Sequence, residues 1–290
     1  MVVNAAERAL ASLTGLSIGD AFGDQFFPVA NRGLDPLTED PPGQWRWSDD
    51  TEMACSVVDR LIRDGRIDQE PLAMDFATRM DIRRRYGSGT LELLEKVRKG
   101  VHWRTAASEG FGGNGSYGNG AAMRVAPLGA FHAGDPALAA TEAAASAEVT
   151  HTHAEGIAGA VAVAVAASHL AGPGPHDVFE AVLHHLTDGS VRHGVEQART
   201  LGAVSAQEAA ARLGNGSRIS AQDTVPFTLW VAARHLNDYE TAVRTCAAVG
   251  GDMDTTAAIV GGIIAAHAPG IPSTWRRCRE PLPAWFGHDA

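Results

Sequence analysis

Two stretches of this chain, 157–167 and 257–266, consist entirely of small and branched apolar residues. A helix built from either stretch has no polar face to turn toward water, so it must be surrounded by other parts of the protein. The many alanines and glycines let neighbouring backbones approach closely, as close packing inside a bundle requires. These stretches therefore predict two central helices and a core formed by helix–helix packing.

The rest of the chain also favours helices. Alanine-rich segments carry apolar residues at helical spacing, as with Val57, Leu61 and Ile62 opposite Asp59 and Arg60. Alternating runs of β-branched residues are nearly absent, and neither a linker nor a repeat of fixed period is visible. We expect one all-α domain over residues 1–290, a compact orthogonal multi-helix bundle of roughly a dozen helices. The predicted helices are 5–13, 52–63, 71–80, 91–99, 121–131, 136–147, 154–170, 177–186, 206–213, 225–236, 240–248 and 255–267.

The charge balance excludes some classes of protein. Lys and Arg number 24 against 34 Asp and Glu, a net charge of −10, so general binding to nucleic acid or to an anionic membrane is not expected. The 3 cysteines contain no CxxC pair, which argues against a disulfide framework or a thiolate zinc site. Glu7 and Arg8 lie where a signal peptide would be apolar, and the apolar runs are shorter than the roughly 20 residues of a membrane span. We expect a cytoplasmic monomer.

A first acidic cluster, "SDDTEM", lies directly before an amphipathic helix. Ser48, Asp49 and Asp50 are residue types that cap a helix N-terminus, where they accept free backbone N–H groups and favour the helix dipole. A cap needs only one side chain, however, and here three oxygen-bearing side chains are consecutive. The cluster is consistent with a cap or with a cation site.

A second cluster, "GGDMDTT", opens the apolar helix near the C-terminus. Asp254 or Thr255 could cap that helix, but the D-x-D spacing of Asp252 and Asp254 also lets alternate carboxylates converge on one point. Carboxylate and hydroxyl oxygens are the ligands that Mg²⁺, Mn²⁺ and Ca²⁺ prefer. If the two helix starts face each other, their side chains could bind two divalent cations.

The third feature is a glycine-dense segment, "EGFGGNGSYGNGAAMRVAPLGAF", over 109–131. It is either a flexible surface loop or a cradle whose backbone N–H groups approach a phosphate or ribose at a helix start. It matches neither a GxGxxG motif in a βαβ unit nor a Walker A motif. Further on, His151 and His153 precede the first apolar stretch, where histidine is usually a hydrogen-bonded residue at a helix end.

Four segments in this order resemble the ADP-ribosylglycohydrolase family: "GLSIGDAFGD" at 15–24, "SDDTEM", "SYGNGAAMRVAPLG" and "GGDMDTTAAIVGGI". The resemblance extends from about residue 9 to residue 267. It implies an all-α fold with two Mg²⁺ or Mn²⁺ ions at the base of a cleft. It also implies binding of ADP-ribose or an ADP-ribosylated substrate, and cleavage of the bond between C1″ of ADP-ribose and an acceptor.

The resemblance assigns roles to residues of both acidic clusters and of the glycine loop. It implies that the metal ligands are Ser48, Asp49, Asp50, Asp252, Asp254 and Thr255. It implies that the substrate-binding residues are Ser116, Tyr117, Gly118, Asn119, Gly120, Met123, Arg124 and His151.

At one position the sequence departs from the family. Many members have a glutamate eight residues after the glycine of the G-D-A motif, and counting from Gly19 gives Phe27. Phenylalanine can neither transfer a proton nor accept a hydrogen bond. We expect a water activated by the cations to attack C1″, with Asp49 or Asp24 as its base. The acceptor could be arginine, serine, a nucleic acid or a small conjugate.

Three other interpretations remain open. Phe27 favours a non-catalytic ADP-ribose-binding protein that has lost proton transfer. A Mg²⁺-dependent terpene synthase also uses aspartate-rich helix ends, but such enzymes need acids at DDxxD spacing inside a helix. Here "DDTE" is followed by Met53, and the second cluster is D-x-D. In the third interpretation the protein is a purely structural bundle in which every acid is a helix cap.

Overall fold

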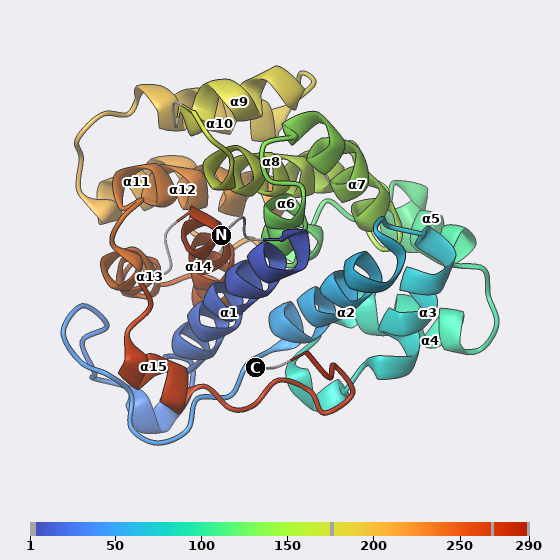
Figure 1. The fold of residues 1–290 in the computed structure, drawn as a ribbon, viewed down its shortest axis with the longest axis horizontal. Helices are drawn as coiled ribbons and strands as arrows, with labels where there is room; N and C mark the ends of the chain where they lie inside the picture. Colours follow the sequence, from blue (N-terminus) through green and yellow to red (C-terminus); the bar gives the residue numbers. More distant parts are fainter. Residues whose placement is uncertain (1–3, 175–176, 268–269, 289–290) are drawn as a thin grey trace.

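The computed structural model describes residues 4–174, 177–267 and 270–288, which contain fifteen α-helices and no strand (Figure 1). The prediction of an all-α fold is confirmed, with 67% of the residues in helices. The helices are α1 (Ala5–Asp24), α2 (Asp49–Asp64), α3 (Gln69–Arg79), α4 (Ser88–Arg98), α5 (Trp103–Gly113), α6 (Ala126–Phe131), α7 (Pro136–Glu148), α8 (Ala154–Ala171), α9 (Val178–His185), α10 (Ser190–Thr200), α11 (Ala206–Leu213), α12 (Ala221–Arg234), α13 (Tyr239–Ala248), α14 (Met253–His267) and α15 (Ser273–Cys278). Short 3₁₀ helices are η1 (Val29–Asn31), η2 (Ile82–Arg84) and η3 (Asn119–Ala121).

The two apolar stretches lie in α8 and α14, and both helices are largely buried, as predicted. α8 is nevertheless longer than the apolar run inside it. Its 18 residues have a mean hydropathy of 1.5, so by length and composition alone it could cross a membrane, which corrects the expectation that this segment is too short. In this fold 67% of α8 is buried among other helices.

α1 packs against α14, and glycines set how closely the two helices approach. A Cβ atom added at Gly19 would lie 2.2 Å from the carbonyl oxygen of Ala257 on α14. One added at Gly15 would lie 2.4 Å from the carbonyl oxygen of Gly261. Both distances are far below van der Waals contact, so only glycine fits at these positions. This packing holds the end of α1 beside the start of α14.

Three helices were missed by the sequence analysis, and one helix end and one helix start were misplaced. α5, α10 and α15 each bury at most three residues, so they lack the wide apolar face that marked the other helices. α1 continues well beyond the predicted end at Leu13, because its glycines are packing positions and not breaks. The predicted helix over 121–131 begins only at Ala126, since the preceding residues form η3 and a turn.

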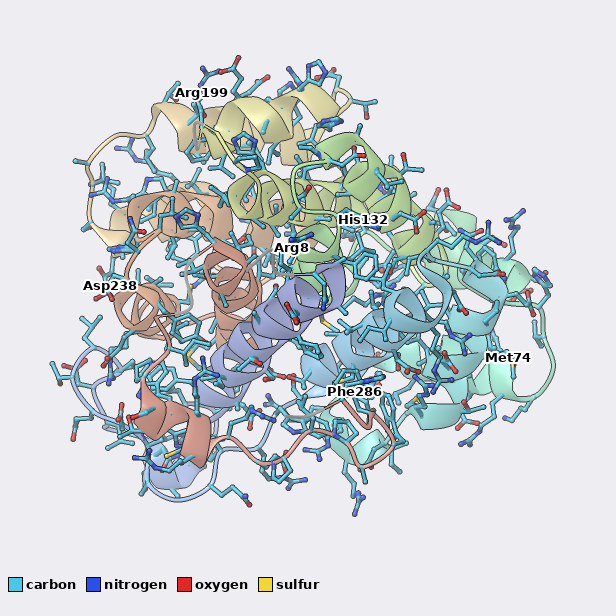
Figure 2. All side chains as sticks on the ribbon, viewed as in Figure 1. Arg8, Met74, His132, Arg199, Asp238 and Phe286 are labelled. Atoms are coloured by element: carbon cyan, nitrogen blue, oxygen red, sulfur yellow. The ribbon has the colours of Figure 1, made fainter. Side chains whose placement is uncertain are left out.

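Figure 2 shows the side chains on this arrangement of helices. Phe286, close to the C-terminus, is buried in a small second core with Leu13, Leu16 and Val58 from α1 and α2. Arg199 and Asp238, by contrast, lie at the edge of the molecule. The C-terminal segment thus helps to fix α1 against α2.

We predict that Gly19→Ala destabilises the protein strongly. The added methyl group would overlap backbone atoms of α14, so the helices must move apart, at a cost of about 3 kcal/mol or more and a decrease of about 5 °C in Tm. Gly89→Ala in α4 is the matched control, because its Cβ would meet only Phe111 at 3.9 Å. Thermal unfolding of both variants tests this packing, and equal Tm values for the two would contradict it.

Candidate active site

A cleft of about 750 Å³ brings together residues from distant parts of the chain. Both acidic clusters, the glycine loop and His151 line it, together with residues of α4, α5 and the loop before α12. The predicted site residues that line the cleft are Asp49, Asp50, Ser116, Tyr117, Gly118, Asn119, Gly120, Met123, His151, Asp252, Asp254 and Thr255. Ser48, Asp24 and Arg124 do not line it.

The starts of α2 and α14 face each other across the base of this cleft. Thr255 Oγ1 donates a hydrogen bond to Asp50 Oδ1 at 3.5 Å, joining residues 205 positions apart. Ser48 is the N-cap of α2 and accepts the backbone N–H of Asp50 at 3.2 Å. The acids therefore do begin helices, but only the hydroxyl of Ser48 is needed as the cap of α2.

The carboxyl groups at these two helix starts are buried close to one another. Burial raises the pKa of Asp49 and Asp50 well above 3.8, and nearby Asp20 and Asp254 raise both further. Burial and then Asp254 raise the pKa of Asp252 to about 8. Such mutual repulsion is relieved by protonation or by a cation held between the groups.

Asp20 on α1 was not recognised from the sequence as part of this cluster. Its buried carboxylate accepts the backbone N–H groups of Ser48 and Thr51 and the hydroxyl of Thr51, at 2.5 to 3.1 Å. Asp20 therefore fixes the first turn of α2 in front of the cleft. Burial and then Asp254 raise its pKa to about 7. The signal that could have revealed it is the G-D-A motif itself.

Arg85 is a second residue that the sequence analysis missed. Its guanidinium pairs with Asp24 and, at 2.6 Å, with Asp254, and it stacks over the Phe27 ring at 4.8 Å from the centroid. In the run "RRRYG", Arg85 looks like an ordinary surface charge.

Among the described residues, no group of three or more His, Cys, Asp or Glu side chains lies close enough together to hold a metal ion as the side chains stand.

Phe27 and Asp24 have different surroundings. Phe27 is 38% exposed and lines the cleft, where it supplies only an apolar surface. Burial raises the pKa of Asp24 to about 6, with the Arg85 guanidinium opposing the shift. Since Asp24 lies outside the cleft lining, the geometry favours Asp49 over Asp24 as a base.

The glycine loop is tied directly to the second acidic cluster. The Asn119 side-chain amide donates to Asp252 Oδ2 at 2.7 Å and to Thr224 Oγ1 at 3.1 Å. Gly118 and Gly120 lie over His151, since a Cβ at either position would come within 3.3 Å of its imidazole. The glycines thus leave open the space above His151 that side chains would fill.

Arg124 lies behind the loop and acts on His151 through one intermediate. It donates to Thr150 Oγ1 at 3.0 Å, and that oxygen is 2.7 Å from His151 Nδ1. The Thr150 hydroxyl thereby links the Arg124 guanidinium to one ring nitrogen of His151 and leaves Nε2 on the side of Gly118 and Gly120. Burial lowers the pKa of His151 to about 3, so the ring is neutral. His153, in contrast, is the N-cap of α8, as the sequence suggested.

Exposed apolar side chains stand at the cleft mouth. Phe111 and Tyr117 are 59% and 43% exposed, and their ring centroids lie 5.9 Å apart. Ile219 is 67% exposed. Phe111 and Ile219 have φ angles of 54° and 51°, a strained conformation that is concentrated at functional sites. Tyr117 is one of the predicted substrate-binding residues and Phe111 lies inside the glycine-dense segment, whereas Ile219 carried no signal in the sequence.

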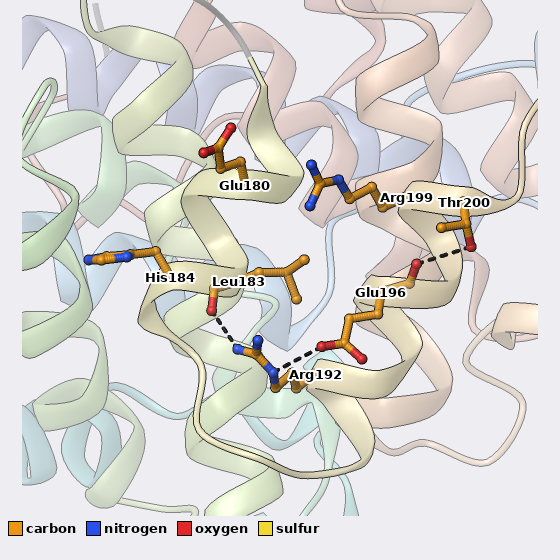
Figure 3. Close-up of a pocket in the computed structure, with 7 residues that line it drawn as sticks. All are labelled: Glu180, Leu183, His184, Arg192, Glu196, Arg199 and Thr200. Carbon is orange, nitrogen blue, oxygen red and sulfur yellow. Dashed lines mark hydrogen bonds and ion pairs between the residues drawn. The ribbon is translucent and has the colours of Figure 1, made fainter.

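A separate hollow of about 500 Å³ lies between α9 and α10 (Figure 3). Arg192 there pairs with Glu196 at 3.0 Å and donates to the Leu183 carbonyl group. None of the predicted site residues lines this hollow. The chemistry is therefore concentrated in the cleft between α2 and α14.

The fold and cleft define a class of protein: an all-α protein with acid-bearing helix ends below a nucleotide-sized cleft. The chain belongs to the ADP-ribosylglycohydrolase family, whose sequence model matches residues 1–287. This family hydrolyses bonds to ADP-ribose. The resemblance drawn from the four sequence motifs is thereby confirmed.

Relatives match along nearly the whole chain. An uncharacterised protein of Archaeoglobus fulgidus is 31% identical, over 93% of this chain and 90% of its own length. The ADP-ribosylhydrolase ARH3 of Danio rerio is 28% identical, over 93% of this chain and 85% of its own. A solved structure described as an ADP-ribosylglycohydrolase-related protein complex has a TM-score of 0.63, covers 96% of this chain and 93% of its own, and shares the fold at 24% identity.

Proposed function

We propose that this protein hydrolyses the bond between C1″ of ADP-ribose and an acceptor, using two divalent cations, Mg²⁺ or Mn²⁺. The observation that carries the proposal is the meeting of two acidic helix starts, about 200 residues apart in the chain, at the base of one cleft. Family membership supports the hydrolysis of ADP-ribose linkages.

The residues present fit divalent cations. The proposed ligands Ser48, Asp49, Asp50, Asp252, Asp254 and Thr255 offer only carboxylate and hydroxyl oxygens, which are ligands for Mg²⁺ and Mn²⁺. Asp50 Oδ2 is buried with no hydrogen-bond partner, an arrangement that is costly unless something else binds the oxygen. Burial first, and then the neighbouring carboxyl groups, raise the pKa of Asp49 and Asp50 well above 3.8, and a bound cation would offset both effects.

The cleft also fits the rest of the ligand. Its volume of about 750 Å³ falls in the range of small-molecule and cofactor sites. We infer that the rings of Phe111 and Tyr117 stack against the adenine. Backbone N–H groups of the loop over 116–120 and the imidazole of His151 then bind diphosphate and ribose oxygens.

In the proposed reaction, departure of the acceptor leaves positive charge on the ribose, which the surrounding carboxylates stabilise. Cations bound at the cluster would orient the ribose hydroxyl groups and acidify a water. Asp49, which lines the cleft, accepts a proton from the attacking water, whose oxygen bonds to C1″ as the bond to the acceptor breaks, and the proton then passes to the departing acceptor atom. Asp20 holds Asp49 and Asp50 in place through the first turn of α2.

The direct test is a panel of ADP-ribose conjugates linked to arginine, serine, a nucleic-acid end or a small ester. Each is incubated with the protein and Mg²⁺ or Mn²⁺, and free ADP-ribose is measured. Release from at least one conjugate, lost on chelation of the metal, is the expected result. No release from any conjugate, with or without metal, would contradict the proposed hydrolysis.

Phe27 favours one other candidate function, a protein that binds ADP-ribose without cleaving it. Calorimetry distinguishes the two candidates. Metal-dependent binding of ADP-ribose, together with no release from the panel, supports the non-catalytic candidate. We further propose that the protein acts as a single-domain cytoplasmic monomer, which the net charge of −10 and the lack of a CxxC pair in the sequence support.

The raised pKa values predict that stability without metal falls as pH rises. Burial and then Asp254 raise the pKa of Asp20 and Asp252 from 3.8 to about 7 and about 8. The folded state therefore holds these protons more tightly, so their contribution to the free energy of unfolding decreases from pH 3.8 up to about pH 8. Thermal unfolding at a series of pH values checks this, and Asp252→Asn should make Tm depend less on pH.

Because cations need ionised carboxylates, Mg²⁺ should raise Tm more at pH 8 than at pH 6. Equal shifts at both pH values would contradict the account.

A further inference from the structure

Arg85 places a positive charge among the acids of the proposed cation site. Its guanidinium contacts Asp24 and Asp254, which the fold brings together from the end of α1 and the start of α14. The Arg85 side chain is 44% exposed and lines the cleft, whereas those of Asp24 and Asp254 are 16% and 10% exposed. The guanidinium therefore covers two buried carboxylates from the solvent side.

Both oxygens of Asp254 are already in use. Oδ1 accepts the backbone N–H of Thr255 at 2.9 Å, and Oδ2 binds Arg85 at 2.6 Å. A divalent cation bound at Asp254 Oδ2 would lie beside the guanidinium on the same oxygen, and the two positive charges would repel each other. At Asp254, the cation and Arg85 therefore compete.

The backbone around Arg85 is fixed on both sides, and only its side chain is free to move. Arg84 stacks on Trp47 at 3.3 Å from the ring centroid and donates to the Trp47 carbonyl group. On the other side, the Tyr86 hydroxyl donates to buried Glu52 at 2.7 Å. These anchors hold Arg85 at a φ of 66°, a conformation unfavourable for a non-glycine residue. Any movement of the guanidinium away from Asp254 would therefore fall to the Arg85 side chain and not to the backbone.

We propose that Arg85 is a displaceable counter-cation of this site. Without metal its guanidinium neutralises Asp24 and Asp254. A divalent cation that binds Asp254 releases the guanidinium into the cleft, on the side of Phe27. The inference rests on the proposed function, because it requires that the acidic cluster binds a divalent cation.

Calorimetric titration of the full chain with Mn²⁺ at pH 8 tests the competition. Arg85→Ala should bind Mn²⁺ more tightly than the unmodified protein, on the order of tenfold, because the competing charge is gone. Arg83→Ala is the matched control, since Arg83 lies on the same turn, is 78% exposed and, among the described residues, forms its ion pair with Asp81. Its affinity should be unchanged. Unchanged or weaker Mn²⁺ binding by Arg85→Ala would overturn the proposal.

Two further readouts do not depend on activity. Arg85→Ala should lower Tm in metal-free buffer and increase the rise in Tm caused by Mn²⁺. The Nε–Hε NMR signal of Arg85, assigned by its loss in Arg85→Ala, should shift on addition of Mg²⁺. If the protein binds no cation at all, both the proposed function and this inference fail. If it binds the cation while the Arg85 signal stays unmoved and the variant's affinity is unaltered, only the inference fails.

Discussion

Replacing Asp254 by alanine is expected to abolish both the binding of divalent cations and the release of ADP-ribose. Asp254 acts on both acidic helix starts, since burial and then nearby charges, that of Asp254 among them, raise the pKa of Asp49, Asp50 and Asp252. Its removal eliminates a proposed ligand at the point where the two helix starts meet. Calorimetry with Mn²⁺ and measurement of free ADP-ribose from the active conjugate check the prediction.

Asp238→Ala is the control for this prediction. Asp238 also opens a helix, and it caps α13 by accepting the backbone N–H and the hydroxyl of Thr241. It lies at the edge of the molecule, away from the cleft (Figure 2). Its loss should cost about 1 kcal/mol of stability and leave cation binding intact. If both variants merely lost this much stability while keeping cation binding and turnover, the structural interpretation, in which every acid is a cap, would hold.

The second large effect is expected from Asp20→Asn. Asp20 is not one of the proposed metal ligands. It holds the first turn of α2, where proposed ligands lie, by accepting hydrogen bonds from Ser48 and Thr51. An asparagine would direct N–H donors toward some of these donor groups, so the first turn would shift. Residues that orient metal ligands typically change affinity 10- to 100-fold when replaced, and we expect about this loss in Mn²⁺ affinity.

Asp59→Asn is the matched control for Asp20→Asn. Asp59 is also a fully buried carboxylate, but it lies further along α2 and pairs with Arg79 at 2.7 Å. Its replacement should lower Tm and leave Mn²⁺ affinity of the folded protein unchanged. Asp20 would have only a general structural role if the two variants lost stability equally and neither lost affinity for Mn²⁺.

The parts of the fold that could be predicted from the sequence are those with a wide apolar face. The apolar runs of α8 and α14 indicated central helices, and both are buried. The extent of α1 could not be predicted, because Gly15, Gly19 and Gly23 lower helix propensity locally. Their presence is explained only by the carbonyl groups of α14 that press against them.

The two acidic clusters were recognisable from the sequence because their acids are consecutive or alternate at helix starts. Arg85 and Asp20 carried no such signal, since each matters through a partner that is remote in the chain. Arg85 meets Asp254 169 positions away, and Asp20 meets Ser48 28 positions away. Only the packing of α1 against α14 and α2 brings these groups together.

The substitution of Phe27 for the family's glutamate is compatible with the rest of the site. Phe27 supplies the surface on which the Arg85 guanidinium stacks. A glutamate there would place another negative charge beside Asp24 and Asp254, whereas phenylalanine adds none. The proton-transfer role in the proposed reaction therefore falls to Asp49, which lines the cleft.

The central claim is that oxygens of both helix starts bind the same divalent cations. Crystals soaked with Mn²⁺ and measured near the manganese absorption edge test it directly, because anomalous difference density locates each bound ion. We predict peaks between the starts of α2 and α14, within ligand distance of Asp50 and Asp254, and with the Arg85 guanidinium moved away. Anomalous peaks that lie only elsewhere in the protein, with no peak between the two helix starts, would contradict the account.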